Sequence, residues 1–428
     1  MRATVAFTGN MLHAQHAALA LHESGILSAY VTSSLTRDNL IARMLRSLPS
    51  SWSQQLEEQL ARRYVVNLPA EKVRSYPFWE VARTLAEKSG ASRLIVDMIW
   101  DIQSHRFDAF VSRRYVPDSD LIQCFEYTAQ NCFEVANDRG IAKVLHLPSL
   151  SNVTYRDLLR REHEMWPQLS ENRHDKYFER KFAERQERRD KEIALADILI
   201  CNSKLTARSH IKAGAEAAKV FVVPLGGPEP IATAGGDPMR PTTSPLRVMY
   251  AGPFSIRKGA HYLLQSWQRL RAGPNATLDV FGALTEPNIL GVENINGVVF
   301  HGSVPKSVLY AAYEQSDVLI FPTLSDGFGM VISEALAHGC PVITTDQAGA
   351  SDLISADCGR VLPAGDISAL TDALQWCLDN RLQLAEMRQY ALNKARSHQW
   401  IDFRSNLRAF LKKGLNERGY NFLAEQVT

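Results

Sequence analysis

Residues 316–345 read SDVLIFPTLSDGFGMVISEALAHGCPVITT and carry the pattern that decides the fold. Val318–Phe321 is a short apolar run typical of a buried strand, and Met330–His338 has helical spacing, so a loop must join a strand to a helix there. A further strand is predicted at Pro341–Thr345. Strand-like runs alternate with helical patterns along most of the chain, which is the sequence form of a doubly wound parallel α/β sheet.

Between the two halves of the chain lies the aperiodic Pro/Gly/Thr-rich stretch GGPEPIATAGGDPMRPTTSP at residues 226–245, which is typical of a linker. We therefore predict two doubly wound, Rossmann-like domains that face each other across a cleft. The first spans residues 1–225 and includes helical insertions, and the second spans 246–400. Residues 401–428 are expected to form a helix that returns to the first domain.

The predicted elements follow the same reading of apolar runs and helical periodicity. In the first domain we expect strands at Thr4–Thr8, Leu27–Thr32, Ala109–Ser112, Leu121–Phe125, Lys143–Leu147, Ile198–Asn202 and Val220–Pro224. In the second domain we expect strands at Leu246–Ala251, Thr277–Phe281, Val298–His301, Val318–Phe321, Pro341–Thr345 and Arg360–Leu362. Helices are expected there at Ala260–Leu270, Lys306–Gln315, Met330–His338, Ile367–Leu378, Leu382–Ser397 and near Phe403–Leu411.

Composition excludes several classes of protein. The chain has 428 residues, of which 45% are hydrophobic and 22% charged, so it can bury a sizeable core and is not disordered. Its net charge of +2 provides no overall basic field for nucleic acid. The opening residues read as a strand and not as a signal peptide, and no run reaches the ~18 apolar residues of a membrane span. Six cysteines without a C-x-x-C pair suit buried, reduced thiols, so a cytoplasmic protein is expected.

Two stretches of the first domain do not fit the alternation. Leu35–Gly90 reads as mainly helical and is a candidate lid on the acceptor side. Arg156–Glu192 is dense in both signs of charge and favours a solvated helix with i,i+4 ion pairs over a membrane or nucleic-acid role. The mild basic excess of the first half permits weak peripheral membrane contact without requiring it.

The loop within the deciding stretch suits a phosphate ligand. Gly327 and Gly329 allow the backbone to approach a ligand closely, and the amides at the start of the following helix favour an anion. Asp326 and Glu334 bracket that helix start. A tight turn with a surface glutamate is the alternative interpretation.

Two further loops of the second domain follow strands at the same sheet edge. One runs from Gly252 to Arg257 and Lys258, whose charges can neutralise a diphosphate at the carboxyl end of a parallel sheet. Exposed charges at a helix start are the alternative for these two cations. The other loop contains Ser303 and Val304.

In this order, the segments RKG, HGSVP and SDGFGMVISEALAHGCPVI resemble the donor-binding half of retaining nucleotide-sugar glycosyltransferases of GT-B architecture, family 4 of the glycosyltransferase classification. The signature of that family is an acidic pair separated by seven residues, here Asp326 and Glu334. The segment KEIALADILICNSKLTARSHIKAGAEAAKVFVVPLGG is similar to the end of the family's first domain. The resemblance covers about two thirds of the chain.

The resemblance implies a role for each matching position. Lys258 and Arg257 would hold the donor diphosphate, Glu334 would bind the ribose hydroxyls, and Asp326 would lie beside the sugar. The remaining donor-binding positions that it implies are Gly252, Ser303, Val304, Gly327, Phe328, Gly329 and Met330. Two positions depart from the pattern: Asp326 is usually Glu, and Pro253 is an Arg in many members.

In the first domain, the loop with Gly9 and Asn10 resembles the glycine loop that lines the cleft, and His16 is expected to face the acceptor. His146, at the end of a central strand, matches the family's cleft histidine. With Asp326 and Lys258 it completes the set of residues expected to act in catalysis. A buried histidine satisfied by backbone groups is the alternative for His146.

The family is described as using front-face attack, in which the leaving diphosphate accepts the acceptor's proton. The resemblance therefore implies a retaining transferase, most simply a hexosyltransferase, with a nucleotide-sugar donor and a glycan or glycolipid acceptor. No metal-ligand motif is evident, so no metal and no separate cofactor are expected. A nucleotide-sugar 2-epimerase and a non-catalytic sugar-nucleotide binding protein remain alternatives. A Rossmann dehydrogenase is disfavoured because no G-x-G-x-x-G follows the opening strand.

Overall fold

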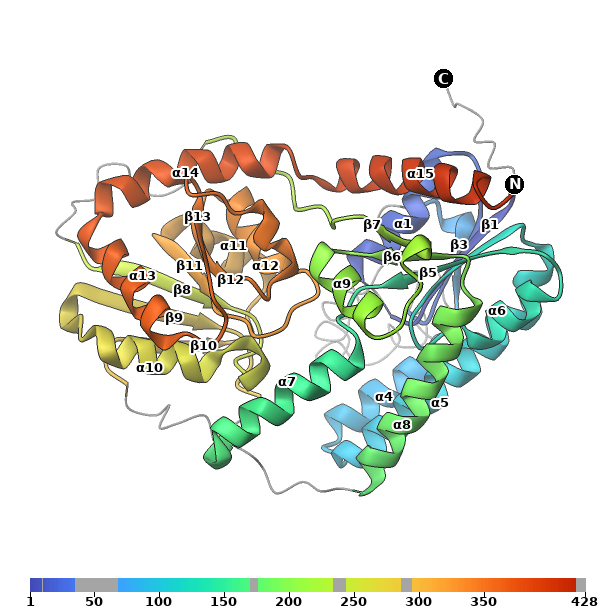
Figure 1. Ribbon diagram of the computed structural model, residues 1–428, viewed down its shortest axis with the longest axis horizontal. Coiled ribbons are helices and arrows are strands. Elements are labelled where there is room, and N and C mark those ends of the chain that lie inside the picture. Colours follow the sequence, from blue (N-terminus) through green and yellow to red (C-terminus); the bar gives the residue numbers. More distant parts are fainter. Residues whose placement is uncertain (10, 35–67, 170–175, 234–243, 286–294, 421–428) are drawn as a thin grey trace, which may run out of the picture.

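The computed structural model describes residues 1–9, 11–34, 68–169, 176–233, 244–285 and 295–420. Over these residues the chain forms two parallel-sheet α/β domains, which lie side by side in Figure 1. The predicted doubly wound fold is therefore confirmed for both halves of the chain.

The first sheet has the order β3-β2-β1-β4-β5-β6-β7, and every pair of neighbours in it is parallel. Its strands are β1 (Ala3–Phe7), β2 (Leu27–Thr32), β3 (Val73–Ser75), β4 (Leu121–Phe125), β5 (Ala142–Leu147), β6 (Ile198–Cys201) and β7 (Val220–Val222). Its helices are α1 (Leu12–Glu23), α4 (Phe78–Lys88), α5 (Arg93–Arg114), α6 (Gln130–Asn137), α7 (Asn152–Met165), α8 (Lys176–Leu195) and α9 (Lys204–Lys212). The central strands are buried along their length, as a sheet covered on both faces requires.

The second sheet has the order β10-β9-β8-β11-β12-β13 and is also parallel. Its strands are β8 (Leu246–Ala251), β9 (Ala276–Phe281), β10 (Val298–Gly302), β11 (Val318–Phe321), β12 (Val342–Thr345) and β13 (Gly359–Leu362). Its helices are α10 (Ala260–Leu270), α11 (Lys306–Gln315), α12 (Met330–Ala337), α13 (Ile367–Asp379) and α14 (Arg381–Arg396). In both sheets the chain reverses its direction of winding beside the first strand, where β1 lies between β2 and β4 and β8 lies between β9 and β11.

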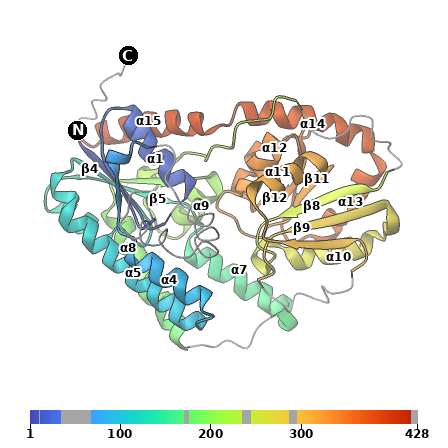
Figure 2. The same ribbon diagram turned by 180° about the vertical axis from the view of Figure 1, so that it is seen from behind.

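The last helix, α15 (Trp400–Asn416), lies against α1 of the first domain. Trp400 stacks on His16 with 4.3 Å between ring centroids, and Arg404 and Arg408 both pair with Glu23. Figures 1 and 2 show α14 and α15 running along one side of the molecule, across both domains.

Two stretches of chain connect the domains and run beside each other. The amide of Gly227 donates to the carbonyl of His398 at 2.9 Å, and Gly227 pairs with Gln399 as a parallel bridge. At Gly226 a Cβ would lie 2.4 Å from the Cα of Trp400, so only glycine allows the two stretches to approach this closely. Much of the predicted linker, residues 234–243, lies outside the described residues.

The structure corrects three expectations in the first domain. Ala109–Ser112 is not a strand but part of α5, because Phe107 and Val111 recur at helical spacing and are both fully buried. The Leu35–Gly90 stretch includes β3 as well as α4, and residues 35–67 lie outside the described residues.

The third correction concerns Arg156–Glu192, which forms α7 and α8 with a short 3-10 turn between them. Exposed i,i+4 pairs are present, such as Arg180 with Glu184. The inner face of α8, however, carries buried ions: Arg188 pairs with Asp108 of α5 at 2.7 Å and with Glu192 at 3.2 Å. Sequence pattern does not reveal this, because a charge run looks the same whether it faces water or an oppositely charged helix.

Candidate donor site and interdomain cleft

The loops after β8 and β11 lie side by side because these strands are neighbours at the point where the second sheet reverses its winding. In open α/β sheets this carboxyl edge is where ligands bind. The β8 loop carries Arg257 and Lys258, and the β11 loop carries Asp326 and Gly327. The sheet topology thus brings together two motifs that are about 70 residues apart in sequence.

Lys258 is 5% exposed and forms an ion pair with Asp326. Its ammonium also lies 5.1 Å from the ring centroid of Phe321, the last residue of β11. Burial lowers the pKa of Lys258, and the charge of Asp326 opposes that shift. Arg257 donates to the carbonyl of Ser325 at 2.9 Å. Both cations therefore face the Asp326 loop and are not solvent-exposed charges at a helix start.

The Asp326 loop is held by backbone contacts on several sides. Asp326 accepts from the amide of Phe328 through Oδ1 at 3.2 Å and receives the amide of Gly349 on its carbonyl at 3.0 Å. Gly329 has a φ of 88° and precedes the first residue of α12, Met330. The left-handed turn at Gly329 lets the chain enter α12 with its first-turn amides beside the loop, where a helix start favours negative charge.

Glu334 lies on the second turn of α12 and is 8% exposed. Its carboxylate is 3.5 Å from the ammonium of Lys306 and accepts from the hydroxyl of Tyr313 at 3.5 Å. Burial raises the pKa of Glu334, and Lys306 opposes this shift. A buried carboxylate with such long contacts has capacity for further hydrogen-bond donors.

Lys306 is a residue that the sequence analysis missed. It begins α11 directly after the loop that contains Ser303 and Val304, so this loop meets the Glu334 side of α12. Ser303 is exposed and Val304 is half-buried against the core. The signal available in the sequence was a lysine directly after the loop of Ser303 and Val304, but its partner on α12 is visible only in three dimensions.

The first domain contacts the Asp326 loop directly. Ser203 and Thr206, at the start of α9, both donate to the carbonyl of Gly327, at 2.6 and 3.1 Å. A Cβ on Gly327 would lie 2.2 Å from the carbonyl oxygen of Pro148, so glycine is required for this approach across the cleft. The S-x-x-T capping pattern at Ser203 was readable from the sequence, but its second role as a clamp on the other domain was not.

His146 lies in β5, two residues before Pro148, and is 5% exposed. Its Nε2 lies 2.9 Å from Oε1 of Gln123, and its ring stacks on Phe125 at 4.5 Å. Burial lowers the pKa of His146 to about 3. The histidine is thus neutral and held by a side chain of β4, which differs from the backbone satisfaction considered as the alternative.

His13, in the first turn of α1, was also missed. Its ring lies 5.2 Å from Phe125 and its buried Nε2 has no hydrogen-bond partner. Burial lowers its pKa to about 4. His13, Phe125 and His146 therefore form one cluster at the carboxyl ends of the central strands, on the edge that faces the cleft.

Of the predicted acceptor-side residues Gly9, Asn10 and His16, the structure describes Gly9 and His16. Gly9 has a φ of 121° and its carbonyl accepts from Thr32 at 2.6 Å, while Asn10 lies outside the described residues. His16 is 6% exposed and lies under Trp400, with Nδ1 3.2 Å from Arg404. The expectation that His16 faces an acceptor is therefore wrong for this arrangement, because α15 covers it. Gly252, with a φ of 123°, begins the β8 loop as predicted.

A second contact joins the domains at the far end of α7. Glu162 is 4% exposed and its Oε2 lies 3.1 Å from both Nε2 of His261 and the hydroxyl of Tyr262. Trp166 donates to the Tyr262 hydroxyl at 3.3 Å. His261 and Tyr262 belong to the first turn of α10, three and four residues after Lys258. This contact therefore links the first domain to the helix that follows the Lys258 loop.

Two absences concern the described part of the chain. Across residues 1–9, 11–34, 68–169, 176–233, 244–285 and 295–420, no group of three or more His, Cys, Asp or Glu side chains is arranged to hold a metal ion. Within the same ranges no helix is both long and apolar enough to cross a bilayer. All six cysteines are buried and free, as predicted.

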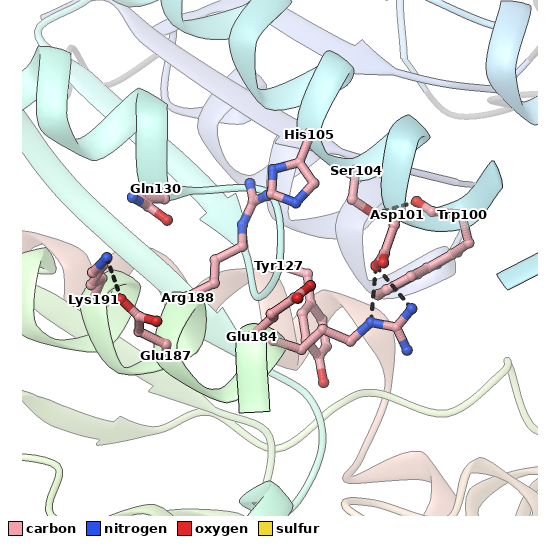
Figure 3. A pocket seen from close by; sticks show the side chains of 11 residues that line it. Trp100, Asp101, Ser104, His105, Tyr127, Gln130, Glu184, Glu187, Arg188 and Lys191 are labelled. Carbon is pink, nitrogen blue, oxygen red and sulfur yellow. Dashed lines mark hydrogen bonds and ion pairs between the residues drawn. The ribbon is translucent and has the colours of Figure 1, made fainter. Parts of the chain in front are cut away.

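The first domain also contains a polar pocket of about 270 Å³ between α5 and α8 (Figure 3). Trp100 and Tyr127 meet edge to face at its wall, with centroids 5.3 Å apart. Arg185 covers the face of Trp100 and pairs with Asp101. None of the predicted donor-binding residues lines this pocket.

Comparison with known proteins finds sequence similarity that is concentrated in the second domain. Residues 245–380 match the family model described as Glycosyl transferases group 1. The capsular polysaccharide biosynthesis glycosyltransferase CapM of Staphylococcus aureus is 34% identical over 136 residues, which is 29% of this chain and 35% of that protein. A D-inositol 3-phosphate glycosyltransferase of Corynebacterium aurimucosum is 27% identical over 231 residues, 48% of this chain and 54% of that protein. The matches thus span about a third to a half of these relatives.

Solved structures match over nearly the whole chain. Anabaena HepE in complex with UDP has a TM-score of 0.59 at 15% identity, covering 96% of this chain and 100% of that one. A UDP-forming α,α-trehalose-phosphate synthase of Burkholderia vietnamiensis has a TM-score of 0.62 at 14% identity, covering 98% and 99%. Residues 245–380 therefore match group 1 glycosyl transferases in sequence, and the whole chain has the two-domain GT-B fold.

Proposed function

We propose that the protein is a retaining glycosyltransferase that moves a sugar, most simply a hexose, from a nucleoside diphosphate sugar to a carbohydrate or lipid-linked acceptor. The observation that carries this proposal is the ion pair of the buried Lys258 with Asp326, in the loops beside the start of α12 and within the segment that matches group 1 glycosyl transferases. Two sequence relatives support it, since the proteins of Staphylococcus aureus and Corynebacterium aurimucosum both carry a glycosyltransferase name, and HepE was solved with UDP.

In this proposal the diphosphate lies between the β8 loop and the start of α12. Lys258 and Arg257 supply positive charge, and the first-turn amides after Gly329 add the helix dipole. The Lys258 pair with Asp326 keeps the lysine charged in a buried site before the donor arrives. Glu334 would accept the ribose hydroxyls while Lys306 balances its charge.

The reaction is proposed to proceed on one face of the sugar. The bond from the anomeric carbon to the diphosphate oxygen breaks, the acceptor oxygen forms a new bond to that carbon, and the acceptor's proton passes to the departing phosphate. Catalysis then rests on positioning and on stabilising the leaving charge, for which the two cations and the helix start are suited without a protein nucleophile or a metal. His146 and His13, which are neutral because they are buried, can position sugar hydroxyls by hydrogen bonds.

The test combines binding and chemistry. Thermal shift with a panel of nucleoside diphosphates, UDP first, identifies the donor base, because a ligand at 100 times its Kd adds about 2.7 kcal/mol. The matching nucleotide sugars are then offered with and without glycan acceptors, and the anomeric configuration of any product is read by NMR. Transfer with retention supports the proposal; epimerised donor would identify a 2-epimerase, and binding without turnover would identify a sensor.

A further inference from the structure

Exposed apolar side chains gather on one helical hairpin of the first domain. This hairpin consists of α4 and α5, which pack along each other and meet at residues 89–92. Six large apolar side chains on it are more than a third exposed: Phe78 (61%), Leu85 (61%), Leu94 (39%), Ile95 (48%), Met98 (47%) and Ile102 (38%). Single exposed apolar residues are ordinary, but a contiguous group marks an interaction surface.

The first half of α5 exposes several apolar side chains. Leu94, Met98 and Ile102 recur every four residues and therefore share one helix face, which points outward. The acidic residues of the same half, Asp97 and Asp101, lie on the side of the helix that faces α8, where both pair with Arg185. The carboxylates of this half thus pair with α8, and the side chains left exposed at Leu94, Met98 and Ile102 are apolar, which suits an apolar environment.

The charges that accompany this outer face are mainly positive. Glu80 and Glu87, the two acidic residues of α4, share Arg83 as an ion-pair partner. The hairpin's exposed basic side chains are Lys88 and Arg93 at its tip and Arg106, Arg113 and Arg114 along α5. Apolar side chains framed by cations match the interface of a bilayer that contains anionic lipids.

The position of the hairpin is also compatible with docking on a bilayer. Figures 1 and 2 place α4, α5 and α8 on the side of the molecule opposite α14 and α15. Met165, the last residue of α7, is 58% exposed, and α7 ends on the same side of the molecule as α4 and α5.

We propose that the α4–α5 hairpin is a peripheral docking surface for an anionic lipid bilayer. The apolar residues Leu85, Leu94, Ile95 and Met98 enter the interface, and the cations contact lipid headgroups. The inference does not depend on the transferase reaction, so a measurement of membrane binding alone tests it.

The test uses the full chain and vesicle co-sedimentation. We compare vesicles of phosphatidylcholine alone with vesicles that also contain about 30% phosphatidylglycerol, an anionic fraction sufficient for electrostatic attraction. We expect binding to the anionic vesicles that weakens with added salt. The double variant Leu94→Ser/Met98→Ser should bind about tenfold more weakly.

A matched control is available on the opposite side of the molecule. Leu382 of α14 and Ile401 of α15 are 73% and 57% exposed, so Leu382→Ser/Ile401→Ser removes comparable apolar surface. This control should bind vesicles like the original protein. Arg106→Ala/Arg113→Ala should weaken binding to anionic vesicles without altering the apolar residues, which guards against a folding defect in the serine variant.

Three outcomes would overturn the proposal. The first is that the protein does not bind anionic vesicles, and the second is that the control pair weakens vesicle binding as much as the hairpin pair does. The third is that the hairpin substitutions change self-association, measured by analytical ultracentrifugation, and not vesicle binding. The last result would assign the surface to a second copy of this chain.

Discussion

The contact of Glu162 with α10 predicts that one carboxylate holds the two domains together at the far end of the cleft. We consider the substitution Glu162→Ala. It removes the acceptor for both the His261 ring and the Tyr262 hydroxyl, each 3.1 Å away. His261 is fully buried and its Nδ1 already has no partner, so the ring would lose its remaining hydrogen bond within this arrangement.

The size of the effect follows from these two bonds. A hydrogen bond to a charged group contributes about 1.5–3 kcal/mol net, so the pair contributes at least ~3 kcal/mol. Each domain has its own sheet and helices, and the lost contact lies between them. The energy is therefore expected to favour separation of the domains more than unfolding of either one. A change of ~3 kcal/mol shifts such an equilibrium by about 150-fold.

The measurement is small-angle X-ray scattering of the full chain, with and without UDP. Glu162→Ala should increase the radius of gyration of the free protein, and UDP should restore less of the compact form. Glu164→Ala is the matched control, because Glu164 is exposed on the same helix and carries the same charge. If Glu162→Ala scatters like the original protein, or if Glu164→Ala has an equal effect, the contact does not hold the domains.

Three further predictions concern the site. Lys258→Ala should weaken UDP binding by about 1.5–3 kcal/mol in calorimetry, and an unchanged Kd would show that the lysine serves only Asp326. Glu334→Gln keeps the shape but removes the charge, so affinity for UDP should fall more than affinity for inorganic diphosphate; equal losses would contradict a ribose role. The depressed pKa of His146, about 3 against an ordinary 6.5, means that the unfolded state binds more protons than the folded state between these values. Stability should therefore fall by about 3 kcal/mol from this group as the pH drops from well above 6.5 to 4.5, and urea titrations of His146→Asn should show a correspondingly smaller loss.

Local sequence determined most of the elements and the position of the donor loops. Four strands, among them Leu121–Phe125 and Val318–Phe321, have the predicted bounds, because buried parallel strands are continuous apolar runs between polar turns. The strand–loop–helix pattern around Asp326 also placed a glycine-rich loop at a sheet edge. Pattern failed at Ala109–Ser112, since a short apolar run is compatible with a strand and with the buried face of a helix.

The tertiary structure alone decided which charges meet. Lys258 and Asp326 come together because β8 and β11 are neighbours in the sheet, and strand order is not contained in the pattern of either strand. His16 is covered because α15 returns to the first domain, more than 380 residues later in the chain. The buried ions of α8 and the Glu162 contact likewise join segments far apart in sequence. Local periodicity reports whether a side chain faces the core or the solvent, but the partner of a buried charge depends on how whole elements pack, and that is settled only when the chain has folded.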